Sequence, residues 1–361
     1  MSGPVACLDI DYFYAQAEEL RNPAIRDKPV VVCVYSGRTQ DSGVVATSNY
    51  VARRYGVRSG MPIRRAKELL RDVDAVFHPV DMPYYSELSR QVFEIAGGFA
   101  DVIEVASIDE AFMNLLEAAA GSFENAASIM ASLKKEIREK VGLTCSIGIA
   151  KNKLLAKMAA DDSKPDGLLV IKPGTEDQYL KPKPIEDIPY IGAKTAKRLQ
   201  EMGIKTIGDL ARVPSDRIIE AFGFRVGRFI YLASRGEYSE QVTPRGGAKQ
   251  VSRMITLKHL TRDEAEIWEQ LGRAIRELHQ RIVEVGYGFR GVSLIGVTRG
   301  MKPVTKSMVL SHHTQEMAEL ENASHQLLRA LLGGLEEDLR RIGVRVYDLS
   351  SERGQSRLTD F

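Results

Sequence analysis

Three acidic residues have the types and the spacing that metal-assisted chemistry needs: Asp9, Asp109 and Glu110. Asp9 lies at the end of the apolar run Val5–Ile10, which predicts a buried strand, and the other two lie where two later strand-like runs meet. Carboxylates that converge without a basic partner repel one another and need cations between them, and hard oxygen ligands suit Mg²⁺. Two such ions about 4 Å apart can activate an attacking hydroxyl and stabilise a leaving phosphate oxygen.

This convergence depends on the backbone between the two later strands. Neighbouring side chains of a regular strand face opposite ways, so a turn or bulge at 108–110 is needed if both carboxylates are to face Asp9. The alternative is that these residues are solvated acids at strand ends, and spacing alone leaves that alternative open.

The first half of the chain predicts an α/β layer with helices on one face. Apolar runs and helical spacing predict strands at 5–10, 29–35, 44–47, 103–108, 111–115 and 144–150, and helices at 12–20, 49–55, 63–70, 126–141 and 152–160. Ser122 is a plausible N-cap for the helix at 126–141.

The second half changes in texture from Pro173 onward. Frequent prolines, with small helices following them, predict a compact helical module as far as Ser234, and the polar, glycine-rich stretch 235–249 predicts a linker. The order strand, helix, strand, strand, helix, strand follows over 250–349, which is the split-βαβ pattern with two helices on one side of an antiparallel sheet. The tail 350–361 is polar.

Charge and composition narrow the class of protein. The net charge is +2, but residues 1–171 carry 20 basic and 23 acidic side chains, whereas residues 245–345 carry 16 and 12. This distribution suits a carboxylate site in the first half of the chain, followed along the chain by modules that bind phosphate. No apolar run could cross a bilayer and no signal peptide is evident, so we expect a cytoplasmic protein with no membrane partner. Cys7, Cys33 and Cys145 form no CxxC pair and are expected to be small buried side chains.

Three long motifs in this order resemble those of the Y-family translesion DNA polymerases, and within that family the archaeal DNA polymerase IV (DinB-like) branch. They are 8–16 (LDIDYFYAQ), 106–111 (ASIDEA) and 146–157 (SIGIAKNKLLAK). The resemblance extends over nearly the whole chain. It implies an α+β multidomain, right-hand polymerase fold with palm (1–18 and 78–171), fingers (19–77), helical thumb with a helix-hairpin-helix (172–234), linker (235–249) and split-βαβ little finger (250–349).

The resemblance also implies an activity. The chain would be a DNA-directed DNA polymerase that performs low-fidelity, low-processivity translesion synthesis by two-metal nucleotidyl transfer, without proofreading. Asp9, Asp109, Glu110 and the carbonyl of Ile10 would hold two Mg²⁺ ions, with Mn²⁺ as an alternative. Its partners would be primer-template DNA, a dNTP and a sliding clamp, and the enzyme would be a monomer.

Tyr14 would lie under the deoxyribose as a steric gate, because an aromatic ring that fills the space of a 2′-hydroxyl excludes ribonucleotides by clash. The alternative is an ordinary core aromatic. Phe13 is expected to share the sugar pocket. Val44 and Ala46 would cover the nascent base pair, and such small residues would leave room for damaged templates.

A second group of residues would bind the triphosphate. Tyr50 and Arg53 are three residues apart and share a helix face, and with Thr47 they form a set of hydrogen-bond donors. In the family the matching residues hold the β- and γ-phosphates together with Lys164. We expect Arg54 and Lys157 to be ordinary surface charges.

Three further segments are candidates for binding DNA or a clamp. The segment 188–199 (IPYIGAKTAKRL) resembles a helix-hairpin-helix, with Ile191, Gly192, Lys194 and Thr195 at the phosphate, and 221–227 is a weaker second copy; either segment could instead be a plain helical hairpin. In the basic last domain the candidate phosphate contacts are Arg253, Arg299, Lys302 and Lys306. Gln355, Leu358 and Phe361 resemble a clamp-binding box that ends in one aromatic instead of two; the alternative is a plain tail.

Two other classes of protein remain as alternatives. Nucleotide cyclases also use two-metal carboxylates on a palm-like fold, but they would not need a hairpin module or a little finger. The second alternative is a catalytically inert, DNA-bound scaffold for the sliding clamp, against which the three intact acids argue.

Overall fold

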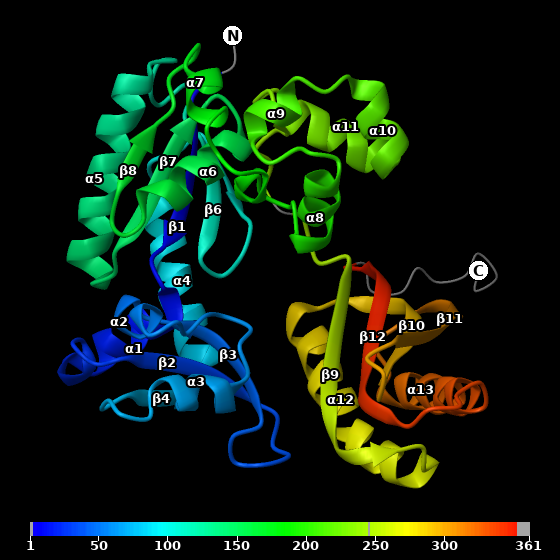
Figure 1. The fold of residues 1–361 in the computed structure, drawn as a ribbon. Coiled ribbons are helices and arrows are strands. Elements are labelled where there is room, and N and C mark those ends of the chain that lie inside the picture. The colour runs from blue at the N-terminus through cyan, green and yellow to red at the C-terminus, as the bar shows by residue number, and fades with distance from the viewer. Residues whose placement is uncertain (1–2, 245, 352–361) are drawn as a thin grey trace, which may run out of the picture. The chain divides into compact units, whose positions relative to one another are not determined.

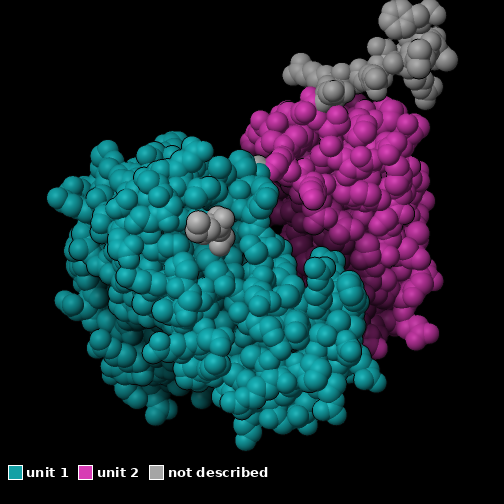
Figure 2. Space-filling model, turned by 90° about the horizontal axis from the view of Figure 1, so that it is seen from above, with its two compact units in different colours: residues 1–34, 44–245 teal, residues 35–43, 246–361 magenta. Residues whose placement is uncertain are grey.

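The computed structural model describes residues 3–244 and 246–351. The chain forms two compact units, residues 1–34 with 44–245 (unit 1) and residues 35–43 with 246–361 (unit 2), which are coloured separately in Figure 2. The described part contains no helix long and apolar enough to cross a membrane.

A five-stranded sheet lies at the centre of unit 1, in the order β5-β6-β1-β7-β8 (Figure 1). Its strands are β1 (Val5–Ile10), β5 (Val102–Val105), β6 (Glu110–Asn114), β7 (Cys145–Ala150) and β8 (Leu168–Val170). β1 is antiparallel to both of its neighbours, and β7 and β8 are parallel. β1 and β7 are almost entirely buried.

Helices cover both faces of this sheet, so the expectation of helices on one face is wrong. Ala6, Leu8 and Ile10 of β1 point into a core that they share with helices α1 (Phe13–Arg21), α4 (Met82–Gly97) and α5 (Phe123–Val141). Cys7 points the other way, into a core built around α6 (Lys153–Ser163) and the later helices. Because side chains alternate along a strand, Asp9 lies on the α6 side with Cys7.

The caps of α5 are those that its sequence predicts. The hydroxyl of Ser122 accepts a hydrogen bond from the backbone N–H of Asn125 at 3.2 Å, and Gly142 ends the helix in the left-handed conformation at φ 79°.

A smaller three-stranded sheet, in the order β3-β2-β4, has a core of its own. It consists of β2 (Val30–Tyr35), β3 (Gly43–Ser48) and β4 (Val76–Pro79), with helices α2 (Tyr50–Arg54) and α3 (Ile63–Leu69) and the 3-10 helix η1 (Pro23–Ile25) nearby in the chain. β2 and β4 are parallel. The sequence had predicted neither β4 nor β8, since both are too short to show a period.

The helical module follows as predicted, and part of its core is shared with α6. Its elements are α7 (Glu176–Leu180), η2 (Ile185–Asp187), α8 (Ala193–Glu201), α9 (Ile207–Ala211), α10 (Ser215–Phe222) and α11 (Phe224–Ala233). Apolar side chains such as Leu199 and Ile230 are buried in the same cluster as Leu155.

Unit 2 has the predicted order of strands and helices. It comprises β9 (Gln250–Thr261), α12 (Glu264–Val285), β10 (Gly288–Thr298), β11 (Pro303–Thr314), α13 (Met317–Leu332) and β12 (Leu339–Ser350). The sheet order is β11-β10-β12-β9, and every neighbouring pair is antiparallel. β12 therefore lies between β9 and β10, which is the split-βαβ arrangement.

All three cysteines are buried, as predicted. Burial raises the pKa of the Cys7 thiol well above its ordinary value, and it raises that of Cys145 to about 12. Both side chains are therefore thiols at neutral pH.

The close packing of α6 on β7 allows a test of the fold. A Cβ atom on Gly148 would lie 2.1 Å from the carbonyl oxygen of Ala156 and 2.2 Å from the backbone nitrogen of Ala160. Gly148→Ala should therefore lower the free energy of unfolding of unit 1 by about 3 kcal/mol, measured by urea unfolding. The matched control is Gly97→Ala at the end of α4, where a Cβ would meet no atom within 4 Å, and its effect should stay within about 1 kcal/mol. Equal midpoints for the two variants would contradict the packing argument.

Candidate active site

The strand pair β1–β6 brings the three predicted carboxylates to one end of the central sheet. Asp9 is paired directly with Glu110, and the backbone N–H of Ile10 donates to the carbonyl of Asp109 at 2.8 Å. The turn that the sequence required is formed by backbone N–H groups of Ala106 and Ser107, which both donate to the carbonyl of Glu110. Asp109 therefore lies just outside β6, where its carboxylate accepts a hydrogen bond from the hydroxyl of Ser107.

Lys157 of α6 lies among these carboxylates, so its expected place on the surface is wrong. Its ammonium is 2.6 Å from Asp9 Oδ2, 2.6 Å from Glu110 Oε2 and 3.1 Å from Asp161 Oδ1. Only 19% of the side chain is exposed. The expectation failed because it took the lysine as lying on a solvated helix face, whereas α6 packs against the sheet on the side of Asp9. Arg54, by contrast, is exposed as expected.

Burial and neighbouring charges shift the pKa values of Glu110 and Lys157. Burial raises the pKa of Glu110, and the nearby ammonium of Lys157 offsets this only in part, because that single charge is shared by three carboxylates. Burial acts to lower the pKa of Lys157, but the carboxylates of Asp9, Glu110 and Asp161 outweigh it and raise the pKa. Lys157 is therefore charged at neutral pH.

A second lysine reaches Asp9 from the loop after α6. The ammonium of Lys164 is 2.8 Å from Asp9 Oδ2 and 3.0 Å from Asp161 Oδ1. Burial acts to lower the pKa of Lys164, but Asp9 outweighs this effect and raises it. Within residues 3–244 and 246–351, no three His, Cys, Asp or Glu side chains are arranged as a metal-binding group. The acids instead surround two ammonium groups.

The loop that carries Lys164 is held in place by Asp11, whose carboxylate is fully buried. Asp11 accepts hydrogen bonds from the hydroxyls of Thr144 and Ser146 at 2.9 and 2.7 Å, and from the backbone N–H of Asp166 at 2.9 Å. Lys134 pairs with the Asp166 carboxylate at 2.9 Å. The loop is thus held from both sides.

Most of the residues predicted to bind the nucleotide line a cavity of about 350 Å³ next to Asp9. Its walls are formed by Asp9, Ile10, Tyr12, Phe13, Tyr14, Ala46, Thr47, Arg53, Ser59, Ile108, Asp109 and Lys164. Of the residues predicted to bind the nucleotide, Val44 and Tyr50 do not line this cavity. Val44 is 44% exposed in β3 and pairs with Pro62. Sequence reasoning did not single out Ser59, because it lies in a short loop with no motif around it.

Tyr50 and Arg53 share a face of α2, as their spacing predicts. The Arg53 guanidinium lies 4.9 Å from the centre of the Tyr50 ring, and its Nε donates to the carbonyl of Ser48 at 2.9 Å. The hydroxyl of Tyr50 is buried and has no hydrogen-bond partner in the described part of the chain. Burial of the group raises its pKa, as does the carboxylate of Asp11. A buried phenol without a partner lacks an acceptor that a bound ligand could supply.

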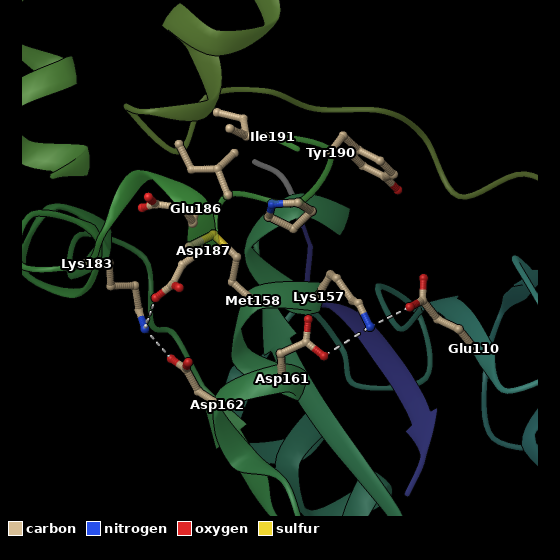
Figure 3. Close-up of a pocket in the computed structure, with 12 residues that line it drawn as sticks. Glu110, Lys157, Met158, Asp161, Asp162, Lys183, Glu186, Asp187, Tyr190 and Ile191 are labelled. Atoms are coloured by element: carbon tan, nitrogen blue, oxygen red, sulfur yellow. Dashed lines mark hydrogen bonds and ion pairs between the residues drawn. The ribbon is translucent and has the colours of Figure 1, made fainter. Parts of the chain in front are cut away.

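A larger cavity of about 510 Å³ lies on the other side of Glu110. It is lined by Glu110, Lys157, Met158, Asp161, Asp162, Lys183, Glu186, Asp187, Ile188, Pro189, Tyr190 and Ile191. Figure 3 shows Lys157 between Asp161 and Glu110, and Lys183 between Asp162 and Asp187. The cavity is therefore bordered both by the carboxylates around Lys157 and by the turn at 188–192 that precedes α8.

The turn at 188–192 connects η2 to α8, as the hairpin of a helix-hairpin-helix connects its two helices. Gly192 is the N-cap of α8 and provides no side-chain cap, so the first N–H groups of the helix are available to a phosphate. Gly192 and Lys194 are exposed, Thr195 is half-buried, and Ile191 is buried in the core. In the segment 221–227, the candidate for a second copy, Gly223 has a φ of 79° and separates α10 from α11.

The four cations predicted in unit 2 lie at different places. Arg253 of β9 is ion-paired with Glu277 of α12. Arg299 and Lys302 lie in the turn between β10 and β11, and Lys306 lies on the edge strand β11. The clamp-binding residues Gln355, Leu358 and Phe361 lie outside the described residues.

Sequence reasoning missed two arginines on the face of the unit 2 sheet that the helices leave open. Ile342, Val344 and Val346 of β12 point into the core, so Arg341 and Arg345 point the other way. Arg345 donates to the hydroxyl of Ser293 at 3.2 Å, and the Nε of each arginine is buried without a partner among the described residues. The strict alternation of residues 341–346 was the signal that could have revealed them.

Comparison with known proteins gives one consistent result. Residues 8–161 match the impB/mucB/samB family, residues 248–359 match its C-terminal domain, and residues 186–237 match a thumb domain described for DNA polymerase-iota. A protein named DNA polymerase IV from Nitrosopumilus maritimus is 41% identical over 98% of both chains, and one from Saccharolobus solfataricus is 35% identical over 99% of both.

Solved structures agree with this result. A Y-family DNA polymerase chimera is 36% identical and superposes with a TM-score of 0.90 over 97% of this chain and 100% of its own. An insertion ternary complex of Dbh DNA polymerase is 35% identical, with a TM-score of 0.71 over the same shares of the two chains.

The ion pairs of Lys157 yield a prediction that does not depend on function. Lys157→Met would remove the ammonium that lies between Asp9 and Glu110, and Lys164 would remain beside Asp9 alone, so the variant should lower the free energy of unfolding by about 3 kcal/mol in urea. Adding Asp9→Asn to this variant should restore part of the loss, because it removes the repulsion between Asp9 and Glu110. The matched control, Lys135→Met on α5, breaks only an exposed pair with Glu139 and should change stability by less than about 1 kcal/mol. If the two lysine variants are equally stable, Lys157 does not hold the carboxylates together.

Proposed function

The chain belongs to the impB/mucB/samB family of Y-family DNA polymerases, and from this premise we propose that it copies damaged DNA by two-metal-ion nucleotidyl transfer, with Asp9, Asp109 and Glu110 as metal ligands. It is a DNA-directed DNA polymerase. The observation that carries the proposal is the 350 Å³ cavity, in which two of these acids meet the residues proposed to bind the sugar and the triphosphate.

The donor set of the site fits divalent metal ions. Three carboxylates and a backbone carbonyl are hard oxygen ligands of the kind that Mg²⁺ or Mn²⁺ prefers. The acids already attract two ammonium groups to within 3 Å of Asp9, which supports a site that demands positive charge. Asp9, the Ile10 carbonyl, Asp109 and Glu110 would hold the ions, which when bound would activate the primer 3′-hydroxyl and stabilise the leaving pyrophosphate.

The chain's own residues would orient the nucleotide. Thr47, Arg53 and Lys164 supply donors for the β- and γ-phosphates, and the partnerless hydroxyl of Tyr50 would add another. Lys157 and Lys164 would balance charge among the acids and the triphosphate. Asp11 would hold the loop of Lys164 in place through its three hydrogen bonds.

Tyr14 and Phe13 would form the sugar pocket, with Tyr14 as the steric gate. Phe13 is buried, and both residues line the cavity. The 2′-hydroxyl of a ribose would clash with the Tyr14 ring, so ribonucleotides would be excluded.

The cover over the base pair supports low fidelity. It would consist of Val44, Ala46 and Ser59, which are small side chains, and Val44 is largely exposed. A loose cover tests the shape of the base pair weakly, so damaged templates and mispairs would be accepted. We also propose that the enzyme acts as a monomer in the cytoplasm, without proofreading and with short synthesis runs, and that its tail binds a sliding clamp.

DNA would be held by contacts that do not read sequence. The first turn of α8, with Lys194 and Thr195, would hold a phosphate through backbone N–H groups. In unit 2 we propose Arg341 and Arg345 as phosphate contacts beside the earlier candidates Arg299, Lys302 and Lys306. Arg253 is a weaker candidate, since Glu277 already pairs with its guanidinium.

Primer extension tests the catalytic proposal. The wild type with Mg²⁺ and dNTPs should extend a primer on an undamaged template and past an abasic site, and EDTA should abolish both reactions. Asp109→Asn and Glu110→Gln should each lower the rate by at least about 10²-fold, because metal positioning contributes several kcal/mol. The control Glu117→Gln, an exposed acid beyond β6, should extend like the wild type. Absence of extension by the wild type with either metal would leave a DNA-bound scaffold as the better account.

The dependence of DNA affinity on salt tests the arginine contacts. Each phosphate contact releases counterions, so the double variant Arg341→Gln, Arg345→Gln should reduce the slope of log Kd against log salt by about 2. Fluorescence anisotropy with labelled primer-template over a KCl series would measure it. Arg329→Gln is the matched control, because that arginine lies on α13 and pairs with Glu264. An unchanged slope in the double variant would exclude these two residues as phosphate contacts.

A further inference from the structure

The ring of Tyr14 is stacked on a second, buried ring. Tyr85 of α4 lies with its ring centre 4.5 Å from that of Tyr14, and the two planes differ by 14°. Tyr85 is 0% exposed and does not line the nucleotide cavity, so it lies behind Tyr14 as seen from the substrate. At this separation the two rings are in van der Waals contact over their faces, and Tyr14 has no space into which to retreat.

The orientation of Tyr85 is fixed in turn by a buried carboxylate. Its hydroxyl donates to Glu18 Oε1 at 2.7 Å, and Glu18 is only 3% exposed. Tyr14 and Glu18 are four residues apart on α1 and therefore lie on one helix face. Tyr85 spans that turn, with its ring against Tyr14 and its hydroxyl on Glu18. Burial and the Glu18 carboxylate raise the pKa of Tyr85, so the hydroxyl keeps the proton that it donates.

We infer that Tyr85, oriented by Glu18, is a positioning residue that holds the ring of Tyr14 in place and thereby sets how strongly ribonucleotides are excluded. This inference rests on the proposed function, in which Tyr14 is the steric gate. Exclusion by clash depends on stiffness, because a ring that can tilt or withdraw by a fraction of an ångström admits the extra hydroxyl. The stacked ring supplies that stiffness and touches no substrate itself.

A merely structural role for Tyr85 would give a different result. Loss of packing would lower stability and reduce the insertion of both nucleotides alike. A positioning role changes the ratio of kcat/KM for a deoxynucleotide to that for the matching ribonucleotide. The ratio is therefore the quantity to measure.

The experiment uses the full chain in steady-state insertion of dCTP and CTP opposite a template dG with Mg²⁺. Tyr85→Leu, which removes the stacked ring, should lower the ratio by about tenfold, mainly through a lower KM for CTP. Tyr85→Phe keeps the ring but loses the hydroxyl and should lower it by about threefold. Glu18→Ala should match Tyr85→Phe, whereas Glu18→Gln keeps an acceptor oxygen and should stay near the wild type.

Two controls separate this effect from general disturbance. Tyr84→Phe changes the neighbouring ring of α4, whose hydroxyl donates to the carbonyl of Ala17 at 3.3 Å, and it should leave the ratio unchanged. In the Tyr14→Ala background, which should itself admit CTP, adding Tyr85→Leu should lower the ratio no further, because Tyr85 acts only through Tyr14.

The outcomes are distinguishable. Suppose that the wild type inserts dCTP. An unchanged ratio in Tyr85→Leu and Tyr85→Phe would then overturn the inference, and so would a ratio that Tyr85→Leu lowers further in the Tyr14→Ala background. Failure of the wild type to insert dCTP would instead overturn the proposed function on which the inference rests. If Tyr85→Leu loses its folded circular dichroism spectrum, Tyr85→Phe and the two Glu18 variants decide the question.

Discussion

Repulsion between Asp9 and Glu110 is the constraint around which unit 1 is organised. Antiparallel pairing of β1 with β6 holds the two carboxylates opposite each other, and the ammonium of Lys157 lies 2.6 Å from both. That ammonium reaches them only because α6 packs directly on the sheet, and α6 can approach so closely because residue 148 of β7 has no side chain. The position of Lys157 at the two carboxylates thus depends on the close packing of α6 and on the glycine at position 148.

The cavity beside this group has walls of unequal stiffness. Its floor is formed by Phe13 and Tyr14 of α1, and Tyr85 of α4 packs behind them. Two buried acids, Glu18 and Glu19, accept hydrogen bonds from the hydroxyls of Tyr85 and Tyr12. Its cover comes from β3 and the short loop around Ser59, with an exposed Val44. A stiff floor and a loose cover would make one enzyme strict about the sugar and tolerant about the base, which is what copying a damaged template requires.

The sequence alone predicted much of this arrangement, and the misses have separate physical causes. Asp9, Asp109 and Glu110 could be found because each lies within a continuous motif, and the split-βαβ order of unit 2 because its strands and helices are long and periodic. The role of Lys157 could not be found, since nothing local shows which face of α6 meets the sheet. β4 and β8 are too short to show a period. Arg341 and Arg345 could have been predicted from the alternation of polar and apolar residues along β12.

The burial of all three cysteines has a practical consequence for watching this enzyme work. Thiol-reactive dyes are attacked by thiolates, and the buried Cys7 and Cys145 stay protonated at neutral pH because their pKa values are raised. A cysteine introduced at an exposed site in each unit would therefore be labelled selectively in the native chain, without first replacing the natural ones. A pair of fluorophores attached in this way would report changes in the distance between unit 1 and unit 2 during synthesis, one molecule at a time.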